Sequence, residues 1–182
     1  MFFEIVLILL KLRESEEIVF NETLVIALVD VQDRVLASTE QSAISSIDLA
    51  SRAISAAQAD DRIDVVVVAS DSEQVLALAH ASDTVNHRLS GGALNSSEVV
   101  LDVLESPETL VEAAARILYL KPNAPSGSLS ELIDEVFTFS SSSVGSPAVT
   151  VKSQYAEARL VEVGRILSER TIEIEALVKT ID

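Results

Sequence analysis

The chain has 182 residues, of which 48% are hydrophobic, and a mean hydropathy of +0.36, which supports a sizeable core and excludes a wholly disordered chain. Its formal net charge of −16, from 29 acidic and 13 basic residues, disfavours binding to nucleic acids and to anionic membranes. Cysteine is absent, which excludes disulfides, thiolate catalysis and cysteine-ligated metal sites.

The charge composition leaves three alternatives for the origin of the chain: a high-salt cytoplasm, an ordinary cytoplasm or a design. Lysine is scarce, with 4 residues against 9 arginines, and an acidic chain poor in lysine is typical of a high-salt cytoplasm. Glutamate outnumbers aspartate 18 to 11, which instead favours an ordinary acidic cytoplasmic protein. A designed chain is a third alternative, against which stand the irregular loops and the serine run near residue 140.

The first apolar run covers residues 2–12 and contains Glu4. It is too short for a membrane-spanning helix and lacks the basic start of a signal peptide, so we expect a core strand, with a helix as the alternative. A second apolar run covers residues 18–31 and is continuous over 24–29. The charged turn at 13–17 between the two runs predicts a hairpin.

Ser38 and Gln41 form a capping box, which predicts a helix that begins at Ser38 and runs to about residue 59. Residues 65–69 follow, four of them valine, and a strand with both faces apolar is typical of the central strand of a parallel sheet. Ser70 and Glu73 form a second capping box, which predicts a helix that ends near the glycines at 91–92.

The same alternation is expected in the second half of the chain. Residues 99–104 are predicted to form a strand, Ser106 to cap a helix that reaches residue 120, and residues 121–127 to form a loop. Ser128 and Glu131 form a further capping box, for a helix to residue 137.

The C-terminal part contains a serine-rich linker or loop at residues 140–147 and a strand at 148–152. Apolar residues at helical spacing predict a helix over residues 156–181, although residues 171–175 alternate as in a strand.

These elements predict an α/β fold, a layered domain with a mostly parallel or mixed central sheet flanked by helices, plus a C-terminal helix. We divide the chain into an α/β domain at 1–139, the linker or loop at 140–147, and a strand with the C-terminal helix at 148–182, packed on the same domain.

Three predicted strands are each followed by a serine that begins the next helix: Ser38, Ser70 and Ser106. Ligands of parallel α/β sheets bind at the carboxyl ends of strands, which makes Ser70, Asp71 and Ser72 candidate catalytic residues, with Mg²⁺ held through Asp71. The simpler interpretation is that these residues are helix caps, each worth about 1 kcal/mol. Because no glycine-rich phosphate-binding motif occurs, we expect no cofactor.

The two histidines of the chain, His80 and His87, lie on the second predicted helix together with Asp83. Offsets of 3 and 7 residues place all three on one side of that helix, as candidate metal ligands. The two histidines would be about 10 Å apart, and this side lies opposite the apolar stripe, which also fits a polar solvent-facing surface.

We predict from these patterns that the protein acts through self-association or through contact with a protein partner. The high apolar fraction and the C-terminal packing helix favour this interpretation. The alternative is a small-molecule-binding domain or enzyme, with its site at the strand ends near Ser38, Ser70 and Ser106. We expect no nucleic acid or membrane partner, and a cytoplasmic location.

Overall fold

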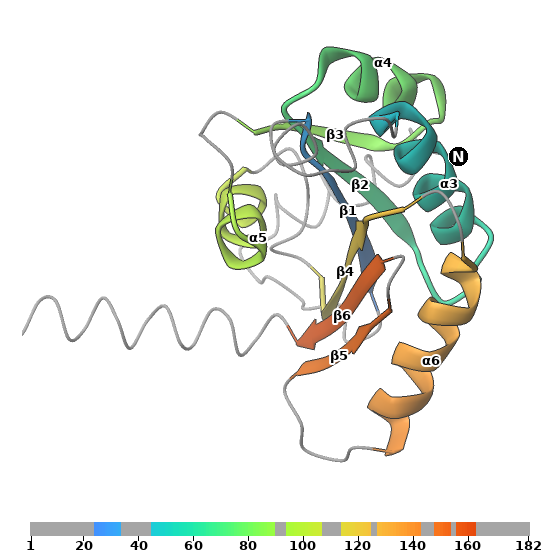
Figure 1. Ribbon diagram of the computed structural model, residues 1–182. Helices are drawn as coiled ribbons and strands as arrows, with labels where there is room; N and C mark the ends of the chain where they lie inside the picture. Colours follow the sequence, from blue (N-terminus) through green and yellow to red (C-terminus); the bar gives the residue numbers. More distant parts are fainter. Residues whose placement is uncertain are drawn as a thin grey trace, which may run out of the picture.

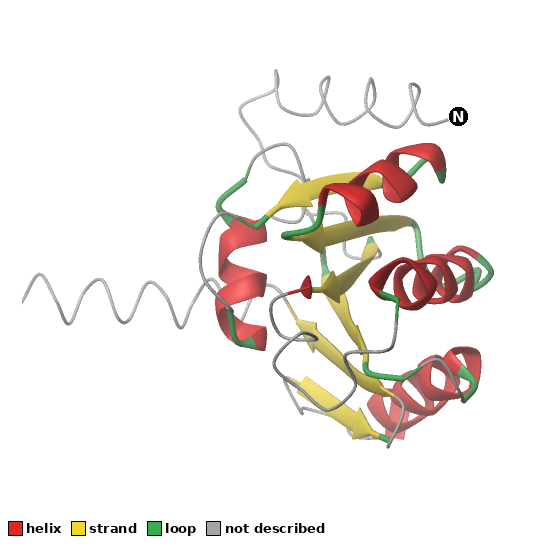
Figure 2. Ribbon diagram, turned by 45° about the horizontal axis from the view of Figure 1, so that its top comes forward, coloured by secondary structure: helices red, strands yellow, loops and turns green. Residues whose placement is uncertain are grey.

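The computed structural model of the chain describes residues 24–33, 45–89, 94–106, 114–124, 127–142, 148–153 and 156–162. These residues form one mixed six-stranded sheet with helices on both faces (Figures 1 and 2), as the sequence predicts. None of the described helices is both long and apolar enough to cross a membrane.

The sheet has the strand order β3-β2-β1-β4-β6-β5. Its strands are β1 (Val25–Val31), β2 (Val65–Ser70), β3 (Val85–Arg88), β4 (Arg116–Pro122), β5 (Ala148–Lys152) and β6 (Ala156–Glu162). The first four pair in parallel with one another, whereas β6 runs antiparallel to both β4 and β5.

Strand β1 is the centre of the fold, because all seven of its residues are buried and it pairs with β2 on one side and β4 on the other. Its sequence is apolar on both faces up to Val29, as a strand covered on two sides requires. The prediction of a central strand at residues 65–69 therefore identifies an interior strand correctly, but β1 holds the more central position.

The helices divide unequally between the two faces of the sheet (Figure 2). One face is covered by α3 (Ser46–Gln58), α4 (Glu73–Ala81) and α6 (Leu129–Ser142), and the other by α5 (Ser96–Leu104). Alternate residues of β1 enter the two resulting cores, with Val29 on the side of α3 and Leu28 on the side of α5.

Capping residues explain where two of the helices begin. The Ser128 hydroxyl accepts a hydrogen bond from the Glu131 amide at 3.2 Å, which confirms the predicted start of α6. Ser45 caps α3 by accepting from the Asp48 amide at 3.4 Å. The predicted cap of that helix, Ser38, lies outside the described residues.

Two predicted elements have the opposite secondary structure. Residues 99–104, predicted as a strand, lie in α5, where Val99 and Val103 are buried one turn apart. A capping box begins this helix, since the Glu98 amide donates to Asn95 Oδ1 at 3.1 Å and the Asn95 amide to Glu98 Oε2 at 2.7 Å. Conversely, residues 116–120 form part of β4, not of a helix, and residues 117–120 are buried and enter the two cores alternately.

The second predicted helix is also too long. It ends at Ala81, and Asp83 adopts a positive φ of 56° that turns the chain into β3. The predicted C-terminal helix is wrong over residues 156–162, where Ala156, Ala158 and Leu160 alternate into the core as strand β6.

The remaining predictions fall partly or wholly outside the described residues. The strand at 148–152 is confirmed as β5, and residues 140–142 of the predicted linker form the last turn of α6. Residues 143–147, the first apolar run at 2–12 and the chain from 163 onward lie outside the described part.

Candidate functional site

The order of the strands defines a specific place at the carboxyl edge of the sheet. From β1 the chain moves outward to β2 and β3, and then returns to the other side of β1 to form β4. The connections therefore diverge between β1 and β4, and such a switch point leaves a crevice that binds ligands in open α/β sheets.

Asp30 occupies this switch point, next to the last residue of β1. Its side chain accepts hydrogen bonds from the Tyr119 hydroxyl at 2.5 Å and from Gln32 Nε2 at 3.0 Å. Lys121 Nζ lies 3.8 Å from Asp30 Oδ2. Segments that are far apart in the sequence thus place a carboxylate, an amide, a phenol and an ammonium group together. We name Asp30, Gln32, Tyr119 and Lys121 the Asp30 cluster.

The electrostatics of the cluster follow from its burial, since Asp30 is only 1% exposed. Burial raises the pKa of the Asp30 carboxyl above its ordinary value, although the hydrogen bonds from Tyr119 and Gln32 oppose this effect. Burial also raises the pKa of the Tyr119 hydroxyl, and the neighbouring Asp30 raises it further. The phenol therefore stays protonated and acts as a hydrogen-bond donor at neutral pH.

Gln32 connects the cluster to the segment that precedes α5. Its amide nitrogen donates to the Leu94 carbonyl at 3.1 Å, and its amide oxygen accepts from the Leu94 backbone N–H at 2.9 Å. This paired contact fixes the approach to α5 against the end of β1.

The predicted residues Ser70, Asp71 and Ser72 lie at the same edge, at the end of β2. Ser70 is the last residue of this strand and not a helix cap, because α4 begins after Ser72, whose side chain makes no capping hydrogen bond. The Ser70 hydroxyl is fully buried and donates to the Val31 carbonyl at 2.6 Å, while it accepts from the Ser72 amide at 3.1 Å.

Asp71 has a different position from its two neighbours. Its Oδ1 atom accepts a hydrogen bond from the Asp33 amide at 2.7 Å, which joins the end of β2 to the end of β1. Its negative charge also contributes to the raised pKa of Asp30, so Asp71 lies within electrostatic reach of the cluster. Asp71 thus lies at the edge where a ligand would bind.

Of the other two predicted strand-end serines, only Ser106 lies among the described residues. Ser106 follows helix α5 and not a strand, so it is not a strand-end residue. Ser38 lies outside the described residues.

The predicted metal ligands do not share a helix. His80 is exposed on α4, Asp83 lies in the turn after it, and His87 lies on β3, where its Nε2 atom is 2.7 Å from Asp102 Oδ2. Within the described ranges, no group of three or more His, Asp or Glu side chains could hold a metal ion. The one-helix arrangement is therefore wrong, because the chain turns at Asp83.

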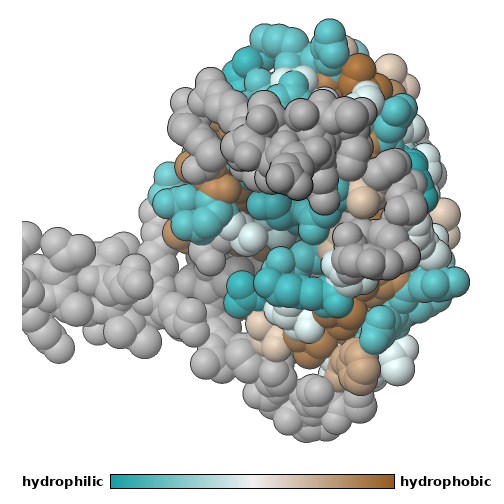
Figure 3. All heavy atoms as spheres, viewed as in Figure 1, coloured by the Kyte–Doolittle hydropathy of each residue, from teal (hydrophilic) through white to brown (hydrophobic). Residues whose placement is uncertain are grey.

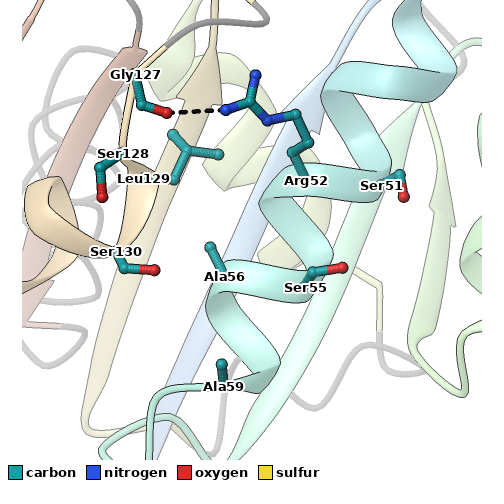
Figure 4. Close-up of a pocket in the computed structure, with 9 residues that line it drawn as sticks. All are labelled: Ser51, Arg52, Ser55, Ala56, Ala59, Gly127, Ser128, Leu129 and Ser130. Carbon is teal, nitrogen blue, oxygen red and sulfur yellow. Dashed lines mark hydrogen bonds between the residues drawn. The ribbon is translucent and has the colours of Figure 1, made fainter.

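A shallow groove of about 380 Å³ lies between α3 and α6 (Figure 4). Small side chains such as Ala56 and Ser55 line it, and Arg52 donates across it to the Gly127 carbonyl at 2.9 Å. The charged group on its wall is already bonded to the backbone, so the groove offers less chemistry than the Asp30 cluster.

The residues that sequence reasoning missed are Asp30, Gln32, Tyr119 and Lys121. The available signal was an aspartate inside an otherwise apolar run, since a buried charge within a core strand is rare without a specific partner. The contribution of β4 could not be found, because that segment was assigned to a helix.

No family model and no curated protein matches the chain. Solved structures do resemble it. One is CMP:2-keto-3-deoxy-manno-octonic acid synthetase complexed with CTP, with a TM-score of 0.56 and 9% identity over 80% of this chain and 78% of that one.

Two further structures are similar. The 4-diphosphocytidyl-2C-methyl-D-erythritol synthase of Anaerococcus prevotii has a TM-score of 0.53 and 10% identity over 85% of this chain and 77% of that chain. A cytidylyltransferase of Leptospira borgpetersenii has a TM-score of 0.52 and 13% identity over 82% of this chain, which spans only 63% of that protein. At these identities the likeness shows the fold alone, an α/β fold with a mixed central sheet flanked by helices.

Proposed function

We propose that the protein is a small-molecule-binding domain that binds CTP at the carboxyl ends of β1, β2 and β4. The observation that carries the proposal is the position of Asp30 and Lys121, side by side at the switch point of the sheet. The three similar structures support it, because each is named for cytidylyl chemistry and one contains CTP.

Lys121 is the residue we assign to the phosphates of the nucleotide. Its side chain is 24% exposed, and its 3.8 Å separation from Asp30 is longer than a hydrogen bond. The ammonium group thus remains able to donate toward the crevice. Asp30 is a positioning residue, since it is buried and orients Lys121 together with Tyr119.

The charge of the chain makes a metal ion part of the proposal. A net charge of −16 and the neighbouring Asp33 and Asp71 would repel a triphosphate. Mg²⁺ is commonly held by one or two carboxylates together with substrate phosphates. We therefore propose that Mg²⁺ enters with the nucleotide and contacts Asp71.

Isothermal titration calorimetry with CTP, with and without MgCl₂, tests this function. We expect Mg²⁺-dependent binding that Lys121→Met weakens by about tenfold, the effect of losing one charge-assisted hydrogen bond. Arg52→Met is the matched control, because it removes one positive charge at the α3–α6 groove. Absence of binding, or equal affinity in the Lys121 variant, would overturn the proposal.

Self-association is the second candidate function. Phe139 on α6 is 48% exposed and Leu101 on α5 is 38% exposed, and large apolar side chains at the surface favour contact with a protein. Figure 3 shows apolar residues that reach a mostly hydrophilic surface in separate places. Light scattering would test it, and a strict monomer would contradict it. The cytoplasmic location stays a prediction, which cell fractionation would check.

A further inference from the structure

The side of the sheet that carries α5 continues beyond that helix onto β6 and β5. On β6, Ala156, Ala158 and Leu160 pack into the core on the side of α6. Side chains alternate along a strand, so Glu157 and Arg159 lie on the opposite face. The apolar cluster beneath α5 contains no described residue of β5 or β6. We name the part of this face that lies on β5 and β6, with Thr150, Lys152, Glu157 and Arg159, the Arg159 surface.

Arg159 is at the middle of this surface. In the strand register it lies opposite Tyr119 of β4 and Thr150 of β5. Its Nε atom is buried and has no hydrogen-bond partner among the residues that the structure describes. Arg159 also takes part in none of the ion pairs found among the described residues.

Within the described part of the chain Arg159 has no acidic partner, although the chain has 29 acidic and 13 basic residues. Some other basic residues do have an acidic partner: Arg62 pairs with Asp60, and Lys152 pairs with Glu157 on the Arg159 surface itself, at 3.0 Å. A buried polar group without a partner is costly, so such groups require an explanation. An acceptor that is not part of the chain would supply one.

We propose that Arg159 binds the oxyanion, a carboxylate or a phosphate, of a small molecule that lies on the sheet face next to the Asp30 cluster. The planar guanidinium presents paired N–H donors that match both groups. Lys121 is its diagonal neighbour across the β4–β6 pair, so the Arg159 surface adjoins the Asp30 cluster. That this molecule binds beside CTP rests on the proposed function. The oxyanion site at Arg159 does not depend on it.

Nuclear magnetic resonance of the arginine Nε–H groups in the full chain tests the site. Sodium phosphate and sodium acetate are titrated separately, with sodium chloride at equal ionic strength as the reference. We expect the Arg159 signal, assigned in the wild type by through-bond correlation with its own backbone amide, to shift saturably with at least one oxyanion and not with chloride. A stronger effect of phosphate indicates a phosphorylated molecule, and a stronger effect of acetate indicates a carboxylic acid.

Arg159→Lys distinguishes the contribution of the paired guanidinium donors from that of the positive charge. Arg159→Lys keeps the charge and loses the paired donors, so we expect oxyanion affinity to fall by about tenfold or more. Arg52→Lys, at the α3–α6 groove, should leave it unchanged. No saturable Arg159 shift with either oxyanion overturns the proposal, as does unchanged affinity in Arg159→Lys; the wild-type titration decides even if that variant fails to fold.

CTP calorimetry keeps the two proposals distinguishable. If CTP does not bind but the Arg159 signal saturates with an oxyanion, the proposed function fails and the oxyanion site stands. If Arg159→Lys lowers the affinity for CTP as strongly as that for phosphate, Arg159 holds the triphosphate itself, and the inference of a separate small molecule is overturned.

Discussion

The Tyr119 hydroxyl donates a hydrogen bond of 2.5 Å to Asp30 Oδ2, across the boundary between β4 and β1. The two residues are 89 positions apart in the sequence, and both are buried. This contact fixes the relative position of the two strands at the point where their connections diverge. It also holds the Asp30 carboxyl group in a buried position that raises its pKa, so the pH dependence of stability reports on this site.

Asp30→Asn should change how stability depends on pH. Burial raises the pKa of Asp30 in the folded state, so the folded protein holds this proton more tightly than the unfolded chain does. The resulting stability is complete below the unfolded pKa of about 4 and is lost as the pH rises through the folded pKa. The free energy of unfolding of the wild type should therefore fall with rising pH relative to that of Asp30→Asn.

Urea denaturation of both proteins over a series of pH values measures this difference. Other carboxyl groups titrate in both proteins, so the difference between the two curves isolates Asp30. Parallel curves from acid to neutral pH would show that the pKa of Asp30 is not raised.

Tyr119→Phe should destabilise the protein by about 1–3 kcal/mol at neutral pH, because a buried carboxylate loses a hydrogen-bond donor. The Tyr119 hydrogen bond lowers the pKa of Asp30, so its loss should raise that pKa further. A double-mutant cycle with Asp30→Asn checks the assignment. The loss should be smaller when Tyr119→Phe is made in the Asp30→Asn variant, where the acceptor is uncharged, and equal losses in both backgrounds would contradict the account.

Arg62 provides a prediction at acidic pH. It donates to Asp60 at 2.5 Å and to Asp134 of α6 at 2.5 Å, and its guanidinium lies 4.3 Å from the centre of the Phe137 ring. The hydrogen bond from Arg62 lowers the pKa of Asp60. Stability from this pair is therefore present above the unfolded pKa of about 4 and is lost as the pH falls through the folded pKa.

Arg62→Met should consequently cost about 1 kcal/mol near neutral pH, and less in acid where Asp60 is protonated. Denaturation at several pH values checks this trend. Arg52→Met is the control, since Arg52 donates to a backbone carbonyl and its contribution should not follow the titration of a carboxyl group. A cost for Arg62→Met that is the same in acid would show that Asp60 does not contribute.

The sequence allowed the fold class to be predicted because burial leaves a strong periodic signal. The four valines of β2 and the buried positions of α3 are examples. The wrong assignments arose where the apolar residues of a short segment fit both the helical and the strand period. Residues 99–104 are a run of apolar residues broken by Asp102, and only the capping box of Asn95 and Glu98, which the prediction overlooked, identifies a helix.

The candidate site could be predicted only as an edge of the sheet. Strand ends followed by serine indicated the carboxyl edge near Ser70 and Asp71, where both residues lie. The contacts of Asp30 with Tyr119 and Lys121 depend on β4 pairing with β1, and strand order is a non-local property that local patterns do not encode. A sequence pattern likewise could not show that the Nε atom of Arg159 is buried without a hydrogen-bond partner among the described residues.

CTP binding at this edge of the sheet is tested most directly by mapping backbone amide chemical shifts on addition of CTP in the presence of Mg²⁺. We predict saturable shifts at Asp30, Gln32, Asp71 and Lys121, at the carboxyl ends of β1, β2 and β4. Saturable shifts confined to the α3–α6 groove around Arg52, or no saturable shift anywhere, would contradict it.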